Sequence, residues 1–234
     1  MEAIFPSTPL PQFQFERTRQ AAPQVFEHMR DMIISMTLPP GSVLSRSELA
    51  AQYGISQTPV RDALMRLSEE GLVDIFPQHA TVVSAVNIML AQQAYFLRRS
   101  IELEVVRTLA ESPATAPVEQ LRANIVRMKA ILTTQDYTEF SLIDQAFHRM
   151  MYEAAQVPDL WPLVRRQSGH LDRLRRLHLP IAGKGAAVIR DHTATVDAIA
   201  DGNPVAAQAC LRAHLSDTLA NLDEIRARFQ SYLK

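Results

Sequence analysis

The sequence predicts a mainly α-helical protein in two parts: three helices with a β-hairpin, followed by an antiparallel bundle of about six helices. The composition favours packed helices, because 47% of the 234 residues are apolar and only seven are glycine. Residues 48–73 have the pattern of two short helices joined by a turn at Gly54. After Asn87 the alternation typical of strands disappears and helical spacing of apolar residues continues to the end.

The first part begins with an arm, residues 1–20, which contains three prolines and no apolar residues at a regular spacing, so we expect it to be flexible.

The ends of the third helix expected in the first part are marked by particular residues. Either Ser56 or Thr58 can cap its start, and Pro59 fits only its first turn, where a missing N–H costs nothing. Gly71 fits the left-handed position that ends this helix. We expect helices over residues 23–35, 46–53 and 57–70, and strands over residues 72–76 and 81–86. Three helices and a hairpin make a winged helix-turn-helix, which can place one helix in the major groove of DNA.

The second part is expected to contain helices only, separated by segments that carry proline or glycine. The expected helices span residues 88–111, 117–134, 137–155, 159–178, 186–200 and 204–231. Six helices of this length form an antiparallel bundle. The predicted organisation is therefore an arm (1–20), a winged helix-turn-helix DNA-binding domain (21–86) and an all-helical domain for ligand or metal binding and dimerisation (87–234).

Several classes of protein are disfavoured by composition. Cys210 is the one cysteine, which excludes an internal disulfide and a zinc site built on cysteines. No apolar run reaches the ~18 residues of a membrane span, and the N-terminus lacks the basic and apolar segments of a secretory signal. We therefore expect a soluble cytoplasmic protein that has no membrane partner.

The charge balance restricts how the first part could bind DNA. The chain carries a net charge of −1, and between residues 21 and 88 four arginines stand against seven acidic residues, a local net charge of −3. Binding must therefore depend on a few well-placed donors rather than on a basic surface. Arg61, near the start of the predicted recognition helix, could bond guanine through two hydrogen bonds. The alternative is a winged helix used for protein contact.

A possible metal site lies in the predicted bundle. Asp144 and His148 are four residues apart, so they share one face of a helix. His192 and His214 lie on opposite sides of the turn at residues 201–204, each roughly 13–15 Å from it along its helix, which puts both imidazoles at the same height. Three histidines and one aspartate suit Zn²⁺, and also Ni²⁺ or Mn²⁺. Alternatively, each histidine is an ordinary core or surface residue.

Such a metal could hold a small organic or sugar acid. Four protein ligands leave one or two positions open on a six-coordinate ion, and a carboxylate could occupy them. Arg98 is a candidate second anchor, because a guanidinium binds carboxylates in a fork. Its alternative role is an ion pair with Glu102 one helical turn away. Arg173, in an arginine-rich helix, could also face the ligand cavity.

The first part resembles the DNA-binding domain of the GntR superfamily of bacterial regulators over residues 24–86. The matching positions are Pro40-Gly41, Leu49-Ala50, Gly54, Ser56-Gln57-Thr58-Pro59-Val60-Arg61, Ala63-Leu64 and Gly71-Leu72-Val73. The helical remainder resembles the FCD ligand-binding domain of the FadR subfamily. Its matching positions are Arg98 with Glu102, Asp144 with His148, His192 and His214.

The resemblance implies a set of DNA contacts at the recognition helix, the second helix and the tip of the wing. These residues are Arg46, Ser47, Ser56, Gln57, Thr58, Arg61, His79 and Ala80. Two of them depart from the family, which commonly has arginine at the position of Gln57 and glycine at that of Ala80. Glutamine suits adenine better than guanine, which points to a changed operator.

The leading hypothesis is a transcriptional regulator, expected to be a repressor, that binds an inverted-repeat operator as a homodimer. A small carboxylate at the metal would shift the population between two arrangements of the DNA-binding heads. One alternative is a regulator for which the metal itself is the effector. A metal-dependent enzyme is a weaker alternative, because no free carboxylate stands at the spacing of a general base and no nucleophile motif is present.

Overall fold

The computed structural model describes residues 13–77, 80–181 and 183–234. The chain divides into two compact units, one formed by Met1–Ile88 with Phe229–Lys234 and the other by Met89–Arg228. The boundary lies two residues beyond the expected end of the first domain. The last six residues, expected to belong to the helical domain, group with the first unit.

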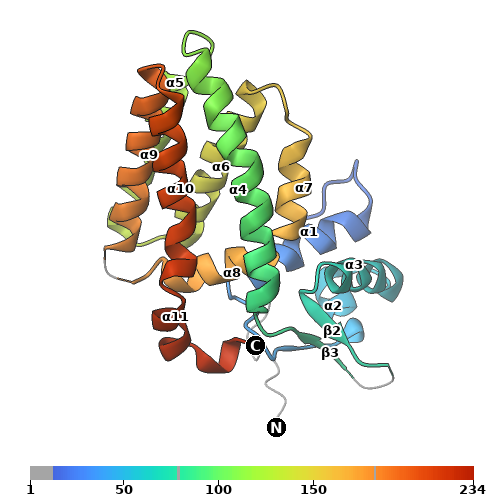
Figure 1. Cartoon of the computed structure of the whole chain (residues 1–234). Helices are drawn as coiled ribbons and strands as arrows, with labels where there is room; N and C mark the ends of the chain where they lie inside the picture. The colour runs from blue at the N-terminus through green and yellow to red at the C-terminus, as the bar shows by residue number, and fades with distance from the viewer. Residues whose placement is uncertain (1–12, 78–79, 182) are drawn as a thin grey trace. The chain divides into compact units, whose positions relative to one another are not determined.

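The first unit is a winged helix-turn-helix, as predicted (Figure 1). Its helices are α1 (Ala21–Ile34), α2 (Arg46–Tyr53) and α3 (Gln57–Glu69), and its strands are β1 (Val43–Leu44), β2 (Val73–Ile75) and β3 (Thr81–Val83). The strands form an antiparallel sheet in the order β1-β3-β2, with Val73 opposite Val83 in the hairpin. The short strand β1 was not predicted, because two residues are too few to show an alternating pattern.

The turn between α2 and α3 is defined by local chemistry. Ser45 caps α2 by accepting a hydrogen bond from the backbone N–H of Glu48. Gly54 ends the helix with a φ of 65°, a left-handed conformation that glycine adopts without strain. Ser56, rather than Thr58, occupies the N-cap position of α3, although its side chain makes no capping hydrogen bond.

The described part of the predicted arm, residues 13–20, contacts the helices of the first unit. Phe13 packs against Tyr53 with ring centroids 5.7 Å apart. The buried side chain of Gln24 accepts a hydrogen bond from one arm amide and donates to three carbonyl groups between residues 16 and 20. Residues 1–12 lie outside the described part, so the expectation of a flexible arm stays a prediction for them.

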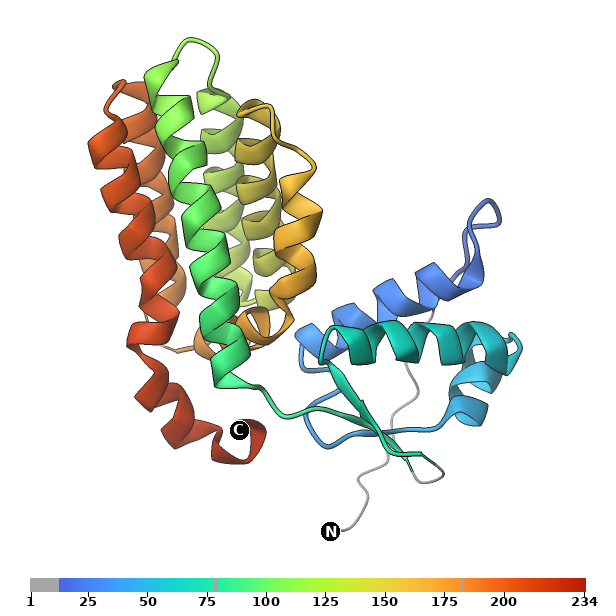
Figure 2. The same ribbon diagram turned by 45° about the vertical axis from the view of Figure 1, so that its right-hand side comes forward.

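In its described residues the second unit contains helices and connecting turns but no strand (Figure 2). Its helices are α4 (Ile88–Glu111), α5 (Val118–Thr134), α6 (Tyr137–Ala154), α7 (Leu160–Gln167), α8 (Gly169–His178), α9 (Lys184–Ala200), α10 (Pro204–Ala220) and α11 (Leu222–Arg228). Two expected helices are each broken in two, at Ser168 and at Asn221. A short 3₁₀ turn, Gln230–Tyr232, follows α11.

Helices α4, α5, α6, α9 and α10 run along the bundle, whereas α8 crosses one end of it (Figures 1 and 2). The core contains Phe140, Phe147 and Met128, each at most 1% exposed. At Gly185, α9 approaches α5 so closely that a Cβ atom would lie 2.4 Å from a methyl group of Leu132. Among the described residues, no helix combines the length and apolarity needed to cross a bilayer.

Candidate metal centre and nucleic-acid interface

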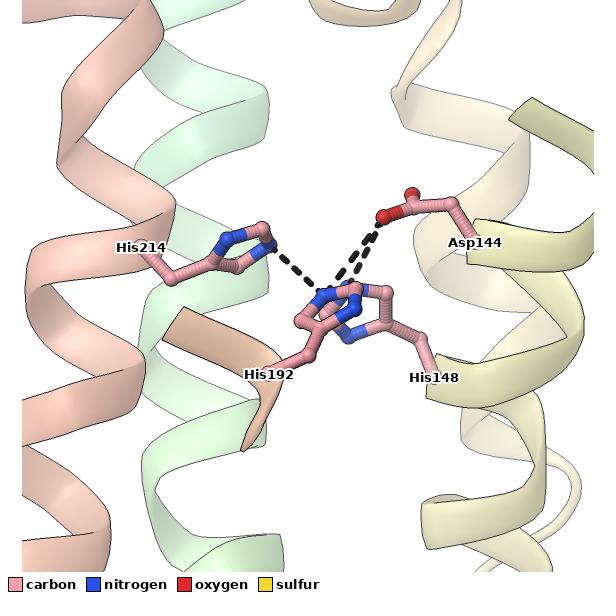
Figure 3. A group of neighbouring side chains, drawn as sticks. All are labelled: Asp144, His148, His192 and His214. Carbon is pink, nitrogen blue, oxygen red and sulfur yellow. Dashed lines mark hydrogen bonds and ion pairs between the residues drawn. The ribbon is translucent and has the colours of Figure 1, made fainter. Parts of the chain in front are cut away.

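Four buried side chains from three helices point toward one another inside the second unit (Figure 3). Asp144 and His148 come from α6, His192 from α9 and His214 from α10. The Nε2 atoms of His192 and His214 lie 3.3 Å apart. Oδ1 of Asp144 lies 3.5 Å from Nε2 of His192 and 3.9 Å from Nε2 of His148. One possible ligand atom from each residue falls within 4.8 Å of all the others.

Local sequence explains why these residues meet. The four-residue spacing places Asp144 and His148 on the buried face of α6. Helices α9 and α10 form an antiparallel hairpin about Gly202, whose φ of 64° permits the tight turn. The hairpin brings His192 and His214 side by side, with ring centroids 4.4 Å apart. The structure thus brings together all four predicted metal ligands.

Burial and neighbouring charges set the protonation of the cluster. Burial lowers the pKa of His192 to about 3 and holds the pKa of His214 well below its usual value, so both rings are neutral at neutral pH. Burial alone would raise the pKa of Asp144, but the guanidinium of Arg175 beside it holds the pKa well below the ordinary value. A carboxylate beside the neutral imidazoles of His192 and His214 is the state that binds a divalent cation.

The cluster contains polar atoms that the described protein leaves unsatisfied. Oδ1 of Asp144 and Nε2 of His148 are buried and have no hydrogen-bond partner within the described part of the chain. Unpaired buried polar atoms are costly, and a metal ion would satisfy both. Tetrahedral bonds of about 2 Å to a central ion place ligand atoms about 3.3 Å apart. The three separations given above are 3.3, 3.5 and 3.9 Å. The residues therefore fit a metal.

Further charged groups surround the candidate ligands. Arg175 donates through Nη2 to Oδ2 of Asp144 at 2.6 Å, which leaves Oδ1 directed at the cluster. Oε2 of Glu102 lies 3.0 Å from Nδ1 of His148. Outer groups of this kind orient metal ligands in known sites. Sequence reasoning missed Arg175, because nothing in the sequence distinguishes it from the other arginines of its arginine-rich helix.

A narrow cavity lies beside the cluster. Its lining residues are Arg98, Gln145, Trp161, Val164, Arg165, Ser168 and Arg175. Arg98 both lines the cavity and forms the alternative ion pair, donating through Nε to Glu102 at 2.7 Å. Arg173 lies on α8 with its guanidinium 2.8 Å from His170, and it is absent from this lining. A ligand-binding role for Arg98 or Arg173 stays a prediction.

The start of α3 presents polar side chains to solvent. Ser56, Gln57 and Thr58 are exposed, and the side chain of Arg61 is 63% exposed. The opposite face of α3 is apolar and buried in the core through Val60, Ala63, Leu64 and Leu67. Arg46 and Ser47 are exposed in the first turn of α2, and Ala80 is half-buried in the wing. His79 lies outside the described residues, so its predicted contact has no structural counterpart here.

Comparison with known proteins agrees with this architecture. Residues 21–83 match the gntR family of bacterial regulatory proteins, and residues 93–217 match the FCD domain. An uncharacterized HTH-type transcriptional regulator in an unstable DNA locus of Streptomyces ambofaciens is 36% identical over 203 residues, covering 87% of this chain and 85% of the relative. The HTH-type transcriptional repressor RspR of Escherichia coli strain K12 is 24% identical over 213 residues, covering 91% and 93%.

A solved structure of a putative transcriptional regulator GntR from Rhodococcus sp. RHA1 has the same fold, with a TM-score of 0.75 at 23% identity, covering 87% of this chain and 97% of that one. The fold and the sequence relatives define a DNA-binding transcriptional regulator rather than an enzyme. The chain belongs to the GntR family and carries an FCD domain in its helical half.

Proposed function

We propose that this protein is a metal-containing transcriptional repressor that responds to a small organic or sugar acid. The observation that carries the proposal is the buried Asp144, His148, His192 and His214 group, whose unsatisfied atoms lie beside a cavity lined by arginines. A homodimer would place two copies of α3 on an inverted-repeat operator. Repression rather than activation is proposed because one relative of this chain, RspR of Escherichia coli, is named as a transcriptional repressor.

The metal would be held by one oxygen of Asp144 and by the three imidazoles, with Zn²⁺ the best match and Ni²⁺ or Mn²⁺ the alternatives. Bound there, it would supply a positive Lewis-acid centre for a carboxylate. Elemental analysis of the untagged protein is expected to find about one metal per chain. His192→Ala and His214→Ala should lose it, whereas His178→Gln, outside the cluster, should keep it. A folded wild-type protein that binds no divalent metal would contradict the proposal.

The effector would place its carboxylate at the metal and would contact Arg98 through a forked pair of hydrogen bonds. A panel of organic and sugar acids is screened by thermal shift with and without zinc, and acids that stabilise the protein are then tested by gel shift. The expected result is an acid that stabilises only the zinc form and weakens operator binding. An effector must bind the two arrangements of the DNA-binding heads with different affinities. An acid that binds the protein without altering its affinity for DNA is therefore not the effector.

DNA contacts are proposed for the exposed residues at the start of α3, for Arg46 and Ser47 in α2, and for His79 and Ala80 in the wing. Arg61→Ala is expected to weaken operator binding by about 1–3 kcal/mol if it reads a base. Arg127→Ala provides a matched control, because its side chain is 64% exposed on α5 in the other unit. Equal effects of the two substitutions in a gel-shift titration would count against a role for Arg61.

Gln57 is the residue proposed to distinguish this operator from others. Gln57→Arg should move the preferred base at one operator position from adenine toward guanine, because glutamine pairs with adenine and arginine with guanine. Selection from a randomised DNA pool by the wild type and the variant measures this change. Unchanged preferences at every position would remove Gln57 from base recognition.

A second candidate is a regulator for which the metal alone is the effector. It is favoured by the completeness of the metal site compared with the narrow cavity beside it. Gel shift with chelator-treated protein and no added acid distinguishes the two. A loss of operator affinity on metal removal, restored by the metal alone, would favour this second function.

A further inference from the structure

Glu102 is a buried carboxylate that joins two parts of the candidate site. It lies on α4 with 0% of its surface exposed. Its Oε1 accepts a hydrogen bond from Nε of Arg98 at 2.7 Å and a longer one from the Tyr152 hydroxyl at 3.4 Å. Its Oε2 lies 3.0 Å from Nδ1 of His148. One oxygen thus faces the proposed acid anchor, and the other faces a proposed metal ligand.

The charge of Glu102 determines which hydrogen bonds it can make. The guanidinium of Arg98 forms an ion pair with it at 2.7 Å, which stabilises the charged form of the carboxyl group. At neutral pH the group is a carboxylate, which accepts hydrogen bonds and donates none. The ring nitrogen that faces it can form a hydrogen bond only if it carries a hydrogen, and in the neutral form of the ring, the form that binds a metal, the opposite nitrogen, Nε2, then has a free lone pair toward Asp144.

The contact between Glu102 and His148 is close but poorly aligned. Oε2 and Nδ1 are within hydrogen-bond distance, yet neither atom has a geometrically acceptable hydrogen bond to any described residue. Both atoms are buried and carry the cost of an unmade bond. A small rotation of the ring would align them, and ligation of a metal by Nε2 would supply a reason for that rotation.

We propose that Glu102 is a positioning residue that holds His148 for the metal and Arg98 for the acid at the same time. The inference rests on the proposed function, because it assumes that the cluster binds a metal. It adds a residue outside the four ligands that determines the tautomer of one of them. Its two carboxylate oxygens also provide a path by which occupancy of the metal site is transmitted to Arg98, since one contacts His148 and the other accepts a hydrogen bond from Arg98.

The first test measures zinc affinity by competition with a chromophoric chelator. Glu102→Gln is expected to bind zinc 10- to 100-fold more weakly, the usual effect of losing an outer carboxylate. An amide can donate to Nδ1 and so favour the tautomer with a hydrogen on Nε2, which cannot bind a metal. Glu104→Gln is the matched control, since Glu104 lies on the same helix with its side chain 59% exposed. Its zinc affinity should equal that of the wild type.

The second test follows nitrogen resonances by NMR in the zinc-loaded and zinc-free protein. In the wild type, His148 should show hydrogen on Nδ1, and zinc should shift the Nε–H resonance of Arg98. In Glu102→Gln, zinc at saturating concentration should leave the Arg98 resonance where it was. If Glu102 had only a structural role, the substitution would change neither the nitrogen of His148 that carries hydrogen nor the response of Arg98 to zinc. Both quantities report on hydrogen bonds made by the two oxygens of Glu102.

The outcomes separate this inference from the proposed function. If the wild type binds no zinc, the proposed function fails and the inference fails with it. If the wild type binds zinc but Glu102→Gln binds it equally well, or zinc does not shift Arg98 in the wild type, only the inference is overturned. If Glu102→Gln fails to fold, the same measurements are made on Glu102→Asp. The aspartate keeps the charge, but its shorter side chain cannot reach both His148 and Arg98. Its zinc affinity is therefore expected to fall as well, and an unchanged affinity would overturn the inference.

Discussion

His192 and His214 are neutral in the folded protein because burial disfavours their charged forms. In the unfolded chain an imidazole takes up a proton near pH 6.5, whereas folded His192 does so only near pH 3. Between these values the unfolded state binds more protons. The stability of the metal-free protein must therefore fall as pH falls below about 6.5.

The expected loss is about 1 kcal/mol for each of these imidazoles between pH 7.5 and pH 5.5. Urea unfolding of chelator-treated protein at the two pH values measures it. His192→Gln, which has no titrating ring, should show a smaller loss than the wild type over the same interval. Identical pH dependence in the two proteins would show that His192 is not held neutral by the fold.

At the scale of secondary-structure elements, the turn between α2 and α3 depends on the backbone of one residue. Gly54 has a φ of 65°, and a Cβ atom built there would have no neighbour within 4 Å. Gly54→Ala therefore introduces backbone strain without a clash, and it should cost about 1–2 kcal/mol. The cost should appear as a lower thermal midpoint of the first unit.

Gln52→Ala is the control for this substitution, because Gln52 is exposed within α2 and alanine is a strong helix former. It should leave the midpoint unchanged or slightly higher. Calorimetry of both variants gives the comparison. If Gly54→Ala is as stable as the wild type, the left-handed turn is not required by the fold.

At the scale of the whole molecule, the chain passes between its two units twice, after Ile88 and before Phe229. Within the first unit the C-terminal segment is hydrogen-bonded to the backbone around the start of α4. The Val86 amide donates to the carbonyl of Tyr232 at 2.7 Å, and the Ile88 amide donates to that of Lys234 at 3.2 Å. The backbone after α11 is thereby joined to the backbone before α4.

Deletion of residues 230–234 should therefore expose the amides of Val86 and Ile88 to solvent exchange, because their acceptors are removed. Hydrogen exchange read by NMR measures the change, and zinc binding in the second unit should be unaffected. Lys234→Ala is the control: it keeps the backbone bonds and removes only the 3.9 Å ion pair with Asp74. Unchanged exchange after the deletion would show that the pairing does not protect these amides.

Much of the fold could be predicted from local patterns. Gly54, Pro59 and Gly71 mark the ends of the helices in the first unit, and their roles follow from backbone geometry that does not depend on packing. The helix break at Ser168 was missed, because its backbone stays near helical angles and the glycine beside it, Gly169, begins the next helix rather than a loop. The strand β1 was missed because pairing with β3, and not its own sequence, defines it.

The sequence by itself determined the winged helix-turn-helix, the helical second unit and the meeting of Asp144 with His148, because helix periodicity and turn chemistry act over a few residues. Only the tertiary structure decided that Arg175 holds Asp144 from 31 residues away and that Glu102 on α4 reaches His148 on α6. Such contacts depend on how helices pack, and packing joins side chains whose separation along the chain follows no period. The outer groups that orient the candidate metal ligands therefore became visible only in the folded molecule.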